Sequence, residues 1–425
     1  MRILHIHKFF NYQGGAEVYL HRIMERQVAR GHEVHILTTR GPDNAESPDR
    51  KYFVHRYDFT KSDGVRGDAQ KALAFLWNRE AKRATERALQ ELKPDIIHLH
   101  NIYHHLSSSI LAPIRRSQIR CVQTLHDLKL ACPNYSMFTE GSVCERCKGG
   151  KYWNPVLHHC LAPSTAANLL AAAEMSMTKI FQSYEKTVHA FICPSQFMRD
   201  KMVEWGEPAS KMTVLRNPAD VSSHAAVRGG GYLLYAGRLS EGKGIEPLIR
   251  ASANVPSLPL KIAGRGPLEE RMKHLVRTLG ASHVQFLGFI PPTELETIRH
   301  HAEAVVVPSM QYDNSPLSLL GAMGQGLPVL ASKIGGIPEI AEDQVHGLLA
   351  VPGDTQAWVA NLQAFQQLTD DQRTAMGRSG RERIRARHDW EQHLEGLERI
   401  YYGKSGSAHR PSYEVGSTGV VKSGE

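Results

Sequence analysis

The chain has 425 residues, of which 41% are hydrophobic and 22% are charged. This is ordinary globular usage and excludes collagen-like, coiled-coil and disordered chains. At about 150 residues per domain, the length predicts two or three domains. No apolar run approaches the roughly 18–20 residues that a membrane-spanning helix needs, and the first residues lack the pattern of a secretory signal. We therefore expect a cytoplasmic protein whose thiols are reduced.

The charge balance is basic, with 51 Lys and Arg against 43 Asp and Glu, a formal net charge of +8. Such a surplus suits a nucleic acid, an anionic membrane surface or a phosphorylated small molecule. The densest basic segments, Lys71–Lys93 and Arg378–His388, have no single-strand binding pattern, and no helix-turn-helix or zinc-finger spacing occurs. We expect no nucleic-acid partner. Both segments are typical of solvated helix faces, and Lys71–Lys93 alternatively of a peripheral contact at the inner face of an anionic membrane.

Short apolar runs alternate with amphipathic segments, which is typical of βαβ units with parallel strands. In the first half, strands are predicted at Ile3–His7, Val34–Thr38, Ile96–His100, Cys121–Thr124 and Ala190–Cys193, with helices at Glu17–Ala29, Gln70–Leu92 and Leu169–Val188. In the second half, strands are predicted at Tyr232–Ala236, Leu260–Ala263, Val284–Leu287, Ala304–Val307 and Val329–Ala331.

The predicted fold class is therefore α/β, with two Rossmann-like doubly wound domains. We predict a first domain over 1–215 with a cysteine-bearing insertion at 132–160, a Pro- and Gly-containing linker over 216–231, and a second domain over 232–387. An amphipathic helix is expected over 388–402. The tail, 403–425, is rich in Gly and Ser and is expected to be disordered.

Ligands of doubly wound domains bind beyond the carboxyl ends of the strands. The turn after the first strand holds Gly14 and Gly15, where backbone amides and a helix N-terminus favour an anion, although an ordinary tight turn is the alternative. The first strand of the second domain is followed by AGRLSEGKG, which contains Gly237, Arg238 and Lys243. Two cations on a glycine-flanked turn suit a diphosphate, and two solvated surface cations are the alternative.

Three further strand ends carry polar or glycine-rich turns. Gly264 lies in IAGRGP, the loop Ser309–Ser315 leads into a helix that Pro316 starts, and Glu339 lies in IGGIPE. The free amides of that helix would suit a phosphate. In the first domain, His126 follows an apolar strand in THD, although a single histidine at such a place is more often structural.

In chain order, the motifs resemble glycosyltransferase family 4: the Gly-Gly turn, PDIIHLHN, THD, CPS, RNPAD, AGRLSEGKG, GRGP, NSPLSLLGAMGQGLPVLAS and GGIPE. The resemblance covers roughly residues 2–402 and implies the GT-B fold, with two domains facing a cleft. It also implies retaining transfer of a hexose from a nucleotide-sugar to a saccharide or lipid-linked acceptor. The setting would be surface polysaccharide synthesis: exopolysaccharide, capsule or lipopolysaccharide. No cofactor is expected to be required for catalysis.

The resemblance also implies roles for individual residues. Arg238 and Lys243 would hold the diphosphate, and His126 would contact the donor sugar near the reacting carbon. The implied catalytic residues are His126, Arg238, Lys243 and Asp313. The implied donor-binding residues are Gly14, Gly15, Gly237, Arg238, Lys243, Gly264, Asn314, Ser315, Pro316, Leu317, Gly321 and Glu339.

One position departs from the family pattern. The family signature has two glutamates separated by seven residues, and this chain has Asp313 and Gly321 there. The second glutamate would accept the ribose hydroxyls, and losing such a charged hydrogen bond costs roughly 1.5–3 kcal/mol, or about 10- to 150-fold in affinity. Glu339 is expected to compensate in part. The alternative function is an inactive GT-B relative that serves as a binding or scaffold subunit. A nucleotide-dependent oxidoreductase is disfavoured because no complete GxGxxG follows the first strand.

The insertion at 132–160 holds four of the six cysteines: Cys132, Cys144, Cys147 and Cys160. The central pair has the two-residue spacing that suits tetrahedral zinc. In a reducing compartment, four thiols in one segment favour a metal over disulfides. Structural zinc, an iron–sulfur cluster and unligated thiols remain open, with His158 and His159 as substitute ligands. Because the insertion leaves the strand end that carries His126, we expect it to overhang the acceptor side of the cleft.

Overall fold

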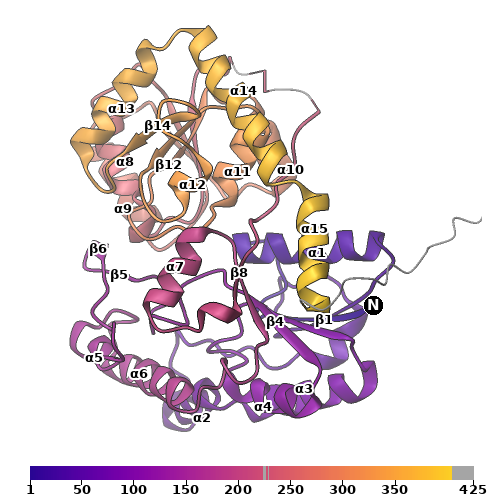
Figure 1. The fold of residues 1–425 in the computed structure, drawn as a ribbon. Coiled ribbons are helices and arrows are strands. Elements are labelled where there is room, and N and C mark those ends of the chain that lie inside the picture. The colour runs from indigo at the N-terminus through magenta and orange to yellow at the C-terminus, as the bar shows by residue number, and fades with distance from the viewer. Residues whose placement is uncertain (224–225, 228, 404–425) are drawn as a thin grey trace, which may run out of the picture.

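The computed structural model describes residues 1–223, 226–227 and 229–403 as two α/β domains, one above the other in Figure 1. The first sheet is parallel, in the order β2-β1-β3-β4-β7-β8. Its strands are β1 (Arg2–Ile6), β2 (Glu33–Leu37), β3 (Ile96–Leu99), β4 (Arg120–Thr124), β7 (Ala190–Cys193) and β8 (Met212–Val214). Strand order reverses at β1 and β3, which is where doubly wound sheets bind ligands.

The second sheet is also parallel, in the order β11-β10-β9-β12-β13-β14. Its strands are β9 (Leu233–Ala236), β10 (Leu260–Ala263), β11 (Val284–Gly288), β12 (Ala304–Val307), β13 (Val329–Ser332) and β14 (Gly347–Ala350). Order reverses at β9 and β12. The predicted fold class, two Rossmann-like domains, is confirmed.

Helices cover both faces of each sheet. Those before the second sheet are α1 (Gly15–Ala29), α2 (Gly64–Leu76), α3 (Arg79–Leu92), α4 (Leu111–Ser117), α5 (Asn154–His158), α6 (Thr165–Ile180) and α7 (Gln196–Glu204). The others are α8 (Ile245–Ser252), α9 (Glu269–Thr278), α10 (Pro292–His300), α11 (Leu317–Gly324), α12 (Ile337–Ile340), α13 (Thr355–Gln367), α14 (Asp370–Arg387) and α15 (Trp390–Tyr402).

Two helix predictions were wrong in extent. The segment predicted as one helix over Gln70–Leu92 is two helices, because Asn78 caps α3 by accepting a hydrogen bond from the Ala81 amide. The helix predicted over Leu169–Val188 ends at Ile180, and turns follow it. Lys71, in the segment considered for membrane contact, is buried and donates to the Lys61 carbonyl oxygen. It therefore offers no charge to a membrane.

The last helix lies against the first domain. Trp390 and Leu394 of α15 share a core with Ile3 of β1 and Tyr19 of α1, and α15 crosses α1 (Figure 1). The Tyr19 hydroxyl lies 2.9 Å from Nε2 of His393. The chain thus returns to its first domain after completing the second. The predicted tail, from residue 404 on, lies outside the described residues.

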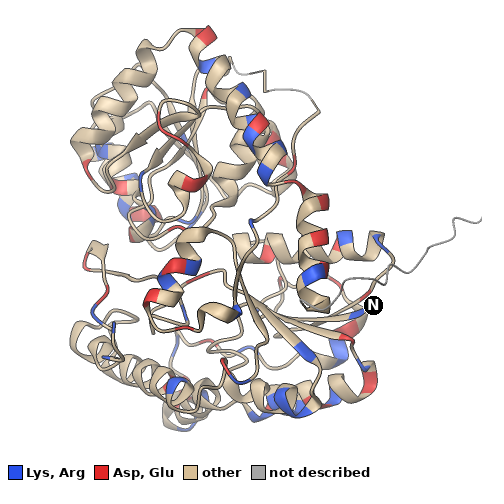
Figure 2. Ribbon diagram, viewed as in Figure 1, with Lys and Arg blue, Asp and Glu red and all other residues tan. Residues whose placement is uncertain are grey.

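Charge is distributed over the whole molecule. Figure 2 shows basic and acidic positions interspersed on both domains. Within the described residues, no helix combines the length and the apolarity that crossing a membrane requires.

Candidate functional site

Several turns singled out in the sequence meet where the two domains touch. The Gly15 backbone faces α11, since a Cβ added there would lie 3.6 Å from Leu317 Cδ1. Asn314 Nδ2 donates to the Leu125 carbonyl oxygen at 3.2 Å, and the Ser195 hydroxyl donates to Asn314 Oδ1. The strand ends of both sheets therefore line one site.

On the second-domain side, Lys243 is held by Asp313. Its Nζ lies 2.8 and 3.0 Å from the two carboxylate oxygens, and the Ser309 hydroxyl donates to the same carboxylate. The Gly242 carbonyl accepts hydrogen bonds from the Met310 and Gln311 amides at 2.8 and 3.0 Å. The AGRLSEGKG turn and the loop before α11 thus form one unit, in which Asp313 fixes the lysine.

The start of α11 presents unused polar groups. Pro316 caps the helix, whose first amides have no intrahelical acceptor. The Ser315 hydroxyl is buried and has no hydrogen-bond partner in the described part of the chain. A buried hydroxyl without a partner is costly, so this end of α11 is suited to a polar ligand.

Two of the predicted donor-binding glycines have a backbone role. Gly264 has a φ of +140°, and a Cβ added to it would lie 1.9 Å from the Gly237 carbonyl oxygen. The turns after β9 and β10 therefore pack backbone to backbone, which only glycine allows here. Arg238, an exposed side chain, directly follows Gly237 at this edge of the second sheet.

On the first-domain side, a chain of hydrogen bonds through buried histidines leads to His126. Gln27 Oε1 lies 2.7 Å from His5 Nε2, His5 Nδ1 lies 3.0 Å from His100 Nε2, and His100 Nδ1 lies 2.9 Å from His126 Nε2. Gln27 Nε2 donates to the Tyr401 hydroxyl of α15 at 3.0 Å. The terminal helix is thereby connected to the site.

This chain of hydrogen bonds determines which nitrogen atom of each histidine ring carries the proton. Because the Gln27 amide nitrogen faces Tyr401, its oxygen faces His5, and His5 Nε2 must donate. His100 and then His126 must donate through Nε2 in turn, which leaves His126 Nδ1 as an acceptor. Burial, and then the charge of Lys8, lower the pKa of His126 to about 3. At neutral pH His126 is therefore an uncharged ring that can accept a hydrogen bond from a hydroxyl group.

Lys8, which lies just beyond β1, was not predicted from the sequence as a site residue. Its Nζ lies 4.0 Å from the centre of the Tyr103 ring, and the Tyr103 hydroxyl donates to the Asp127 carboxylate. Burial lowers the pKa of Lys8, the Asp127 carboxylate raises it, and Arg238 of the second domain lowers it further. Burial raises the pKa of Asp127 to about 6. Lys8 and Arg238 thus face one region from opposite domains, and an anion placed there would satisfy both.

Two family models together match residues 13–383. The model described as Glycosyltransferase Family 4 matches residues 13–223, and the one described as Glycosyl transferases group 1 matches residues 218–383. The chain belongs to glycosyltransferase family 4.

Individual relatives agree with this family. The chain is 28% identical over 368 residues to an uncharacterized glycosyltransferase of Methanocaldococcus jannaschii, covering 81% of this chain and 84% of that protein. It is 28% identical over 333 residues to O-antigen chain mannosyltransferase B of Escherichia coli, covering 73% and 77%. Its fold is shared with Anabaena HepE, solved in complex with UDP and glucose, with a TM-score of 0.67 at 18% identity over 94% and 99% of the chains. The protein is a glycosyltransferase of the GT-B type.

In this family 4 glycosyltransferase, Glu339 makes contacts that the sequence did not suggest. Its carboxylate accepts hydrogen bonds from the Gln196 and Phe197 amides, 2.9 and 2.5 Å away, at the start of α7. Glu339 therefore caps a helix of the opposite domain, where a carboxylate is favourable. Both of its oxygen atoms are engaged in joining the domains.

The family's second signature position, Gly321, lies inside α11 and faces a cation. A Cβ added there would lie 2.5 Å from Nη1 of Arg299, whose Nε donates to Gln325 Oε1 at 2.9 Å. Arg299 comes from α10 and carried no sequence signal, because only the fold brings it to Gly321. A guanidinium thus lies beside the position where the family has a carboxylate.

A group of histidines also has metal-like spacing. In the described residues, His5, His98 and His100 are the one group of three or more candidate ligands whose atoms all lie within 4.8 Å. The two ring nitrogen atoms of His98 are hydrogen-bonded to the Tyr401 and Thr124 hydroxyl groups, both at 2.8 Å. With His5 and His100 in the chain to His126, each ring nitrogen already has a partner, so hydrogen bonding accounts for this group.

Proposed function

We propose that this glycosyltransferase transfers a hexose, with retention, from a nucleotide-sugar to a saccharide or lipid-linked acceptor in surface polysaccharide synthesis. The observation that carries the proposal is that Arg238 acts electrostatically on Lys8 of the other domain. Lys243 pairs with Asp313 in the loop before α11, whose last residue, Ser315, has a buried hydroxyl with no partner in the described residues. HepE, which shares the fold, binds UDP and glucose, and the E. coli relative acts on O-antigen chains. These likenesses support a nucleotide-sugar donor and a polysaccharide acceptor.

The arrangement suits departure of a nucleoside diphosphate. Negative charge grows on the diphosphate as the glycosidic bond breaks, and fixed cations stabilise that charge most in the transition state. Lys243 is held in place by Asp313, so little reorganisation is needed. His126, neutral with Nδ1 as acceptor, would orient a hydroxyl of the donor sugar. No protein-bound metal ion is required for these steps.

The test is a screen of nucleotide-sugars by thermal shift, followed by hydrolysis and transfer assays with the purified full-length chain. A true donor at 100 times its Kd should stabilise the protein by about 2.7 kcal/mol. The anomeric configuration of the product, read by NMR, should match that of the donor. An inverted product would contradict retention, and absence of any nucleotide-sugar shift would contradict donor binding.

The second candidate is an inactive relative that binds without turning over. Gly321 and the adjacent Arg299 favour it, because the expected ribose acceptor is replaced by a cation. The same screen separates the two candidates: a scaffold would bind a nucleotide-sugar yet show neither hydrolysis nor transfer.

A further inference from the structure

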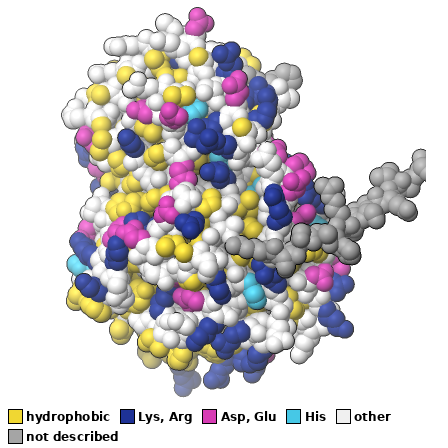
Figure 3. Space-filling model, in the orientation of Figure 1, with side chains coloured by type: hydrophobic (Ala, Val, Ile, Leu, Met, Phe, Trp, Pro, Cys, Tyr) yellow, Lys and Arg dark blue, Asp and Glu magenta, His cyan; other side chains and the backbone are white. Residues whose placement is uncertain are grey.

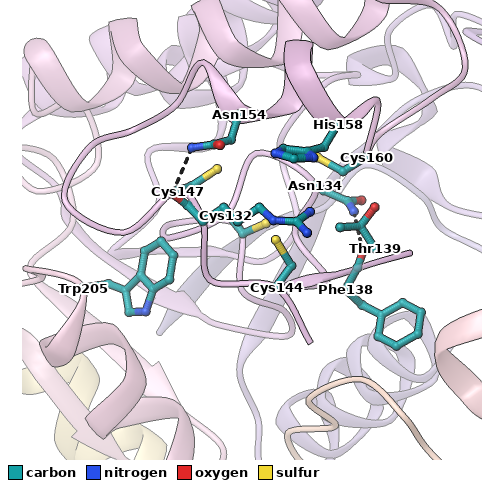
Figure 4. Close-up of a pocket in the computed structure, with 11 residues that line it drawn as sticks. Cys132, Asn134, Phe138, Thr139, Cys144, Cys147, Asn154, His158, Cys160 and Trp205 are labelled. Atoms are coloured by element: carbon teal, nitrogen blue, oxygen red, sulfur yellow. Dashed lines mark hydrogen bonds between the residues drawn. The ribbon is translucent and has the colours of Figure 1, made fainter. Parts of the chain in front are cut away.

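The four cysteines of the insertion share one pocket. Cys132, Cys144, Cys147 and Cys160 line it together with His158, and Figure 4 shows their sulfur atoms turned toward the common space. None of the cysteines in the described residues forms a disulfide. Cysteines up to 28 residues apart in the sequence are thus brought together as thiols, without a covalent link.

The insertion has little regular structure to hold it in this shape. Its hairpin, β5 (Phe138–Thr139) and β6 (Ser142–Val143), has two residues in each strand. Four of its non-glycine residues have left-handed backbone angles: Tyr135, Met137, Glu140 and His159. Such conformations persist only where the surroundings enforce them. A cross-link among the thiols would supply that restraint.

We propose that Cys132, Cys144, Cys147 and Cys160 bind one structural zinc ion. Four thiolates, two of them in a CxxC turn after a short hairpin, form the tetrahedral sulfur set that zinc prefers. In the described residues no three of these sulfur atoms all lie within 4.8 Å of one another, and the Arg146 guanidinium lies beside the Cys144 thiol. Zinc therefore draws the thiolates together, releases their protons and displaces Arg146, which is exposed and already paired with Glu140 at 2.9 Å.

The zinc turn also contacts the catalytic loop of the other domain. Glu145, between Cys144 and Cys147, accepts hydrogen bonds from the Tyr312 hydroxyl at 2.9 Å and from Lys201 Nζ at 2.8 Å. Tyr312 directly precedes Asp313, the partner of Lys243. The ion thereby fixes the first-domain side of a contact that positions the diphosphate loop.

Elemental analysis of the full-length chain tests the site. We expect about one zinc per chain in the wild type and loss of most of it in the Cys144→Ser/Cys147→Ser variant. Cys121→Ala, which removes a core thiol outside the insertion, should keep the metal. Cobalt substitution should give thiolate-to-cobalt absorption in the wild type and in Cys121→Ala alone.

If the double variant fails to fold, a second measurement on the wild-type protein still tests the site. In the wild-type protein, a zinc chelator should expose four additional thiols to a thiol reagent under native conditions. Zinc well below one per chain, iron in its place, or a thiol count that the chelator does not change would overturn the proposal.

A different observation points to a lipid surface. Nine of the nineteen exposed large hydrophobic side chains in the described residues lie on or at the ends of α2, α5 and α6, and α6 packs against both of the others. They are Val65, Leu73, Trp77, Trp153, Leu157, Leu169, Met177, Ile180 and Phe181. Figure 3 shows hydrophobic side chains at the lower left, over α5 and α6. An apolar surface of this kind marks an interaction site.

The charges around this surface select the partner. Between residues 151 and 181 the chain has one acidic residue, Glu174, which is buried and paired with Lys129 at 2.6 Å. The exposed charges flanking α5 and α6 are Lys151 and Lys186. We infer that the α5–α6 face docks on an anionic membrane, with Trp153 and Leu157 in the interface and the lysines at the headgroups. The contact thus rests on apolar side chains, of which Leu73 and Trp77 lie in the segment Lys71–Lys93, and not on the basic residues of that segment.

Vesicle co-sedimentation without any donor tests this docking. The wild type should bind phosphatidylglycerol-containing vesicles, more weakly at high salt, and should bind pure phosphatidylcholine vesicles less. Ile180→Ser/Phe181→Ser should weaken binding by about 100-fold, since each buried apolar side chain is worth roughly tenfold or more. Val351→Ser, an exposed valine of the second domain, should bind as the wild type does.

The competing occupant is a second copy of the chain. If the double variant changed the oligomeric state and left vesicle binding unaltered, the face would be a protein interface and the membrane proposal would be overturned. Equal binding to neutral and anionic vesicles would also contradict it.

Discussion

Replacing Lys243 with alanine is expected to lower kcat by about 10²–10³-fold, the usual cost of removing one preorganised donor to a developing negative charge. Lys243 is held in place by hydrogen bonds to both oxygen atoms of Asp313. Its removal also leaves the Asp313 carboxylate without its cation beside the proposed diphosphate site, which adds repulsion. The measurement is kcat and KM for sugar transfer with the donor found in the screen.

Two variants separate charge stabilisation from a general loss of structure. Asp313→Asn keeps the lysine and loses only its positioning, so a smaller fall in kcat, about tenfold, is expected. Lys273→Ala removes a partly exposed lysine of α9 that pairs with Glu269 and Glu270, and it should leave kcat unchanged. If Lys243→Ala stayed within about threefold of the wild type, the lysine would have no role at the leaving group.

The central strands of the second domain were the elements that the sequence predicted best. Predicted strands at Leu260–Ala263 and Ala304–Val307 coincide with β10 and β12, because strands buried on both faces appear as continuous apolar runs. Short edge strands carry little of that signal, so Met212–Val214 and Gly347–Ala350 were missed. The break between α2 and α3 was missed because Asn78 interrupts an otherwise helical pattern with a single capping residue.

Residues of the candidate site could be predicted from the sequence only where they directly follow a strand. Lys243 and His126 stand in such turns, and the structure brings Lys243 onto Asp313 and His126 onto His100. The contact between Arg299 and Gly321 could not be predicted from the sequence, because it depends on how α10 packs near α11. Glu339 shows the opposite case, in which a family motif marked the residue but not the helix that it caps.

Gly321→Glu tests what the family's missing carboxylate would do in this chain. The new side chain would meet the end of Arg299, a flexible group that can shift and pair with it. The single variant should therefore gain less than about tenfold in donor affinity, because the carboxylate is shared with the guanidinium. Gly321→Glu/Arg299→Ala frees the carboxylate for the ribose and should gain about 10- to 150-fold, the value of a charged hydrogen bond. Calorimetric titration with the donor measures both.

Gly321→Ala is the matched control for the helix itself. Alanine in place of a helix glycine gains up to about 1 kcal/mol, and displacing the end of Arg299 offsets part of that gain. Donor affinity should stay unchanged. If instead the double variant bound the donor no better than the wild type, the ribose would not lie at this turn of α11. Arg299 would then be read as a structural replacement for the glutamate, filling the space beside Gly321 and held by Gln325.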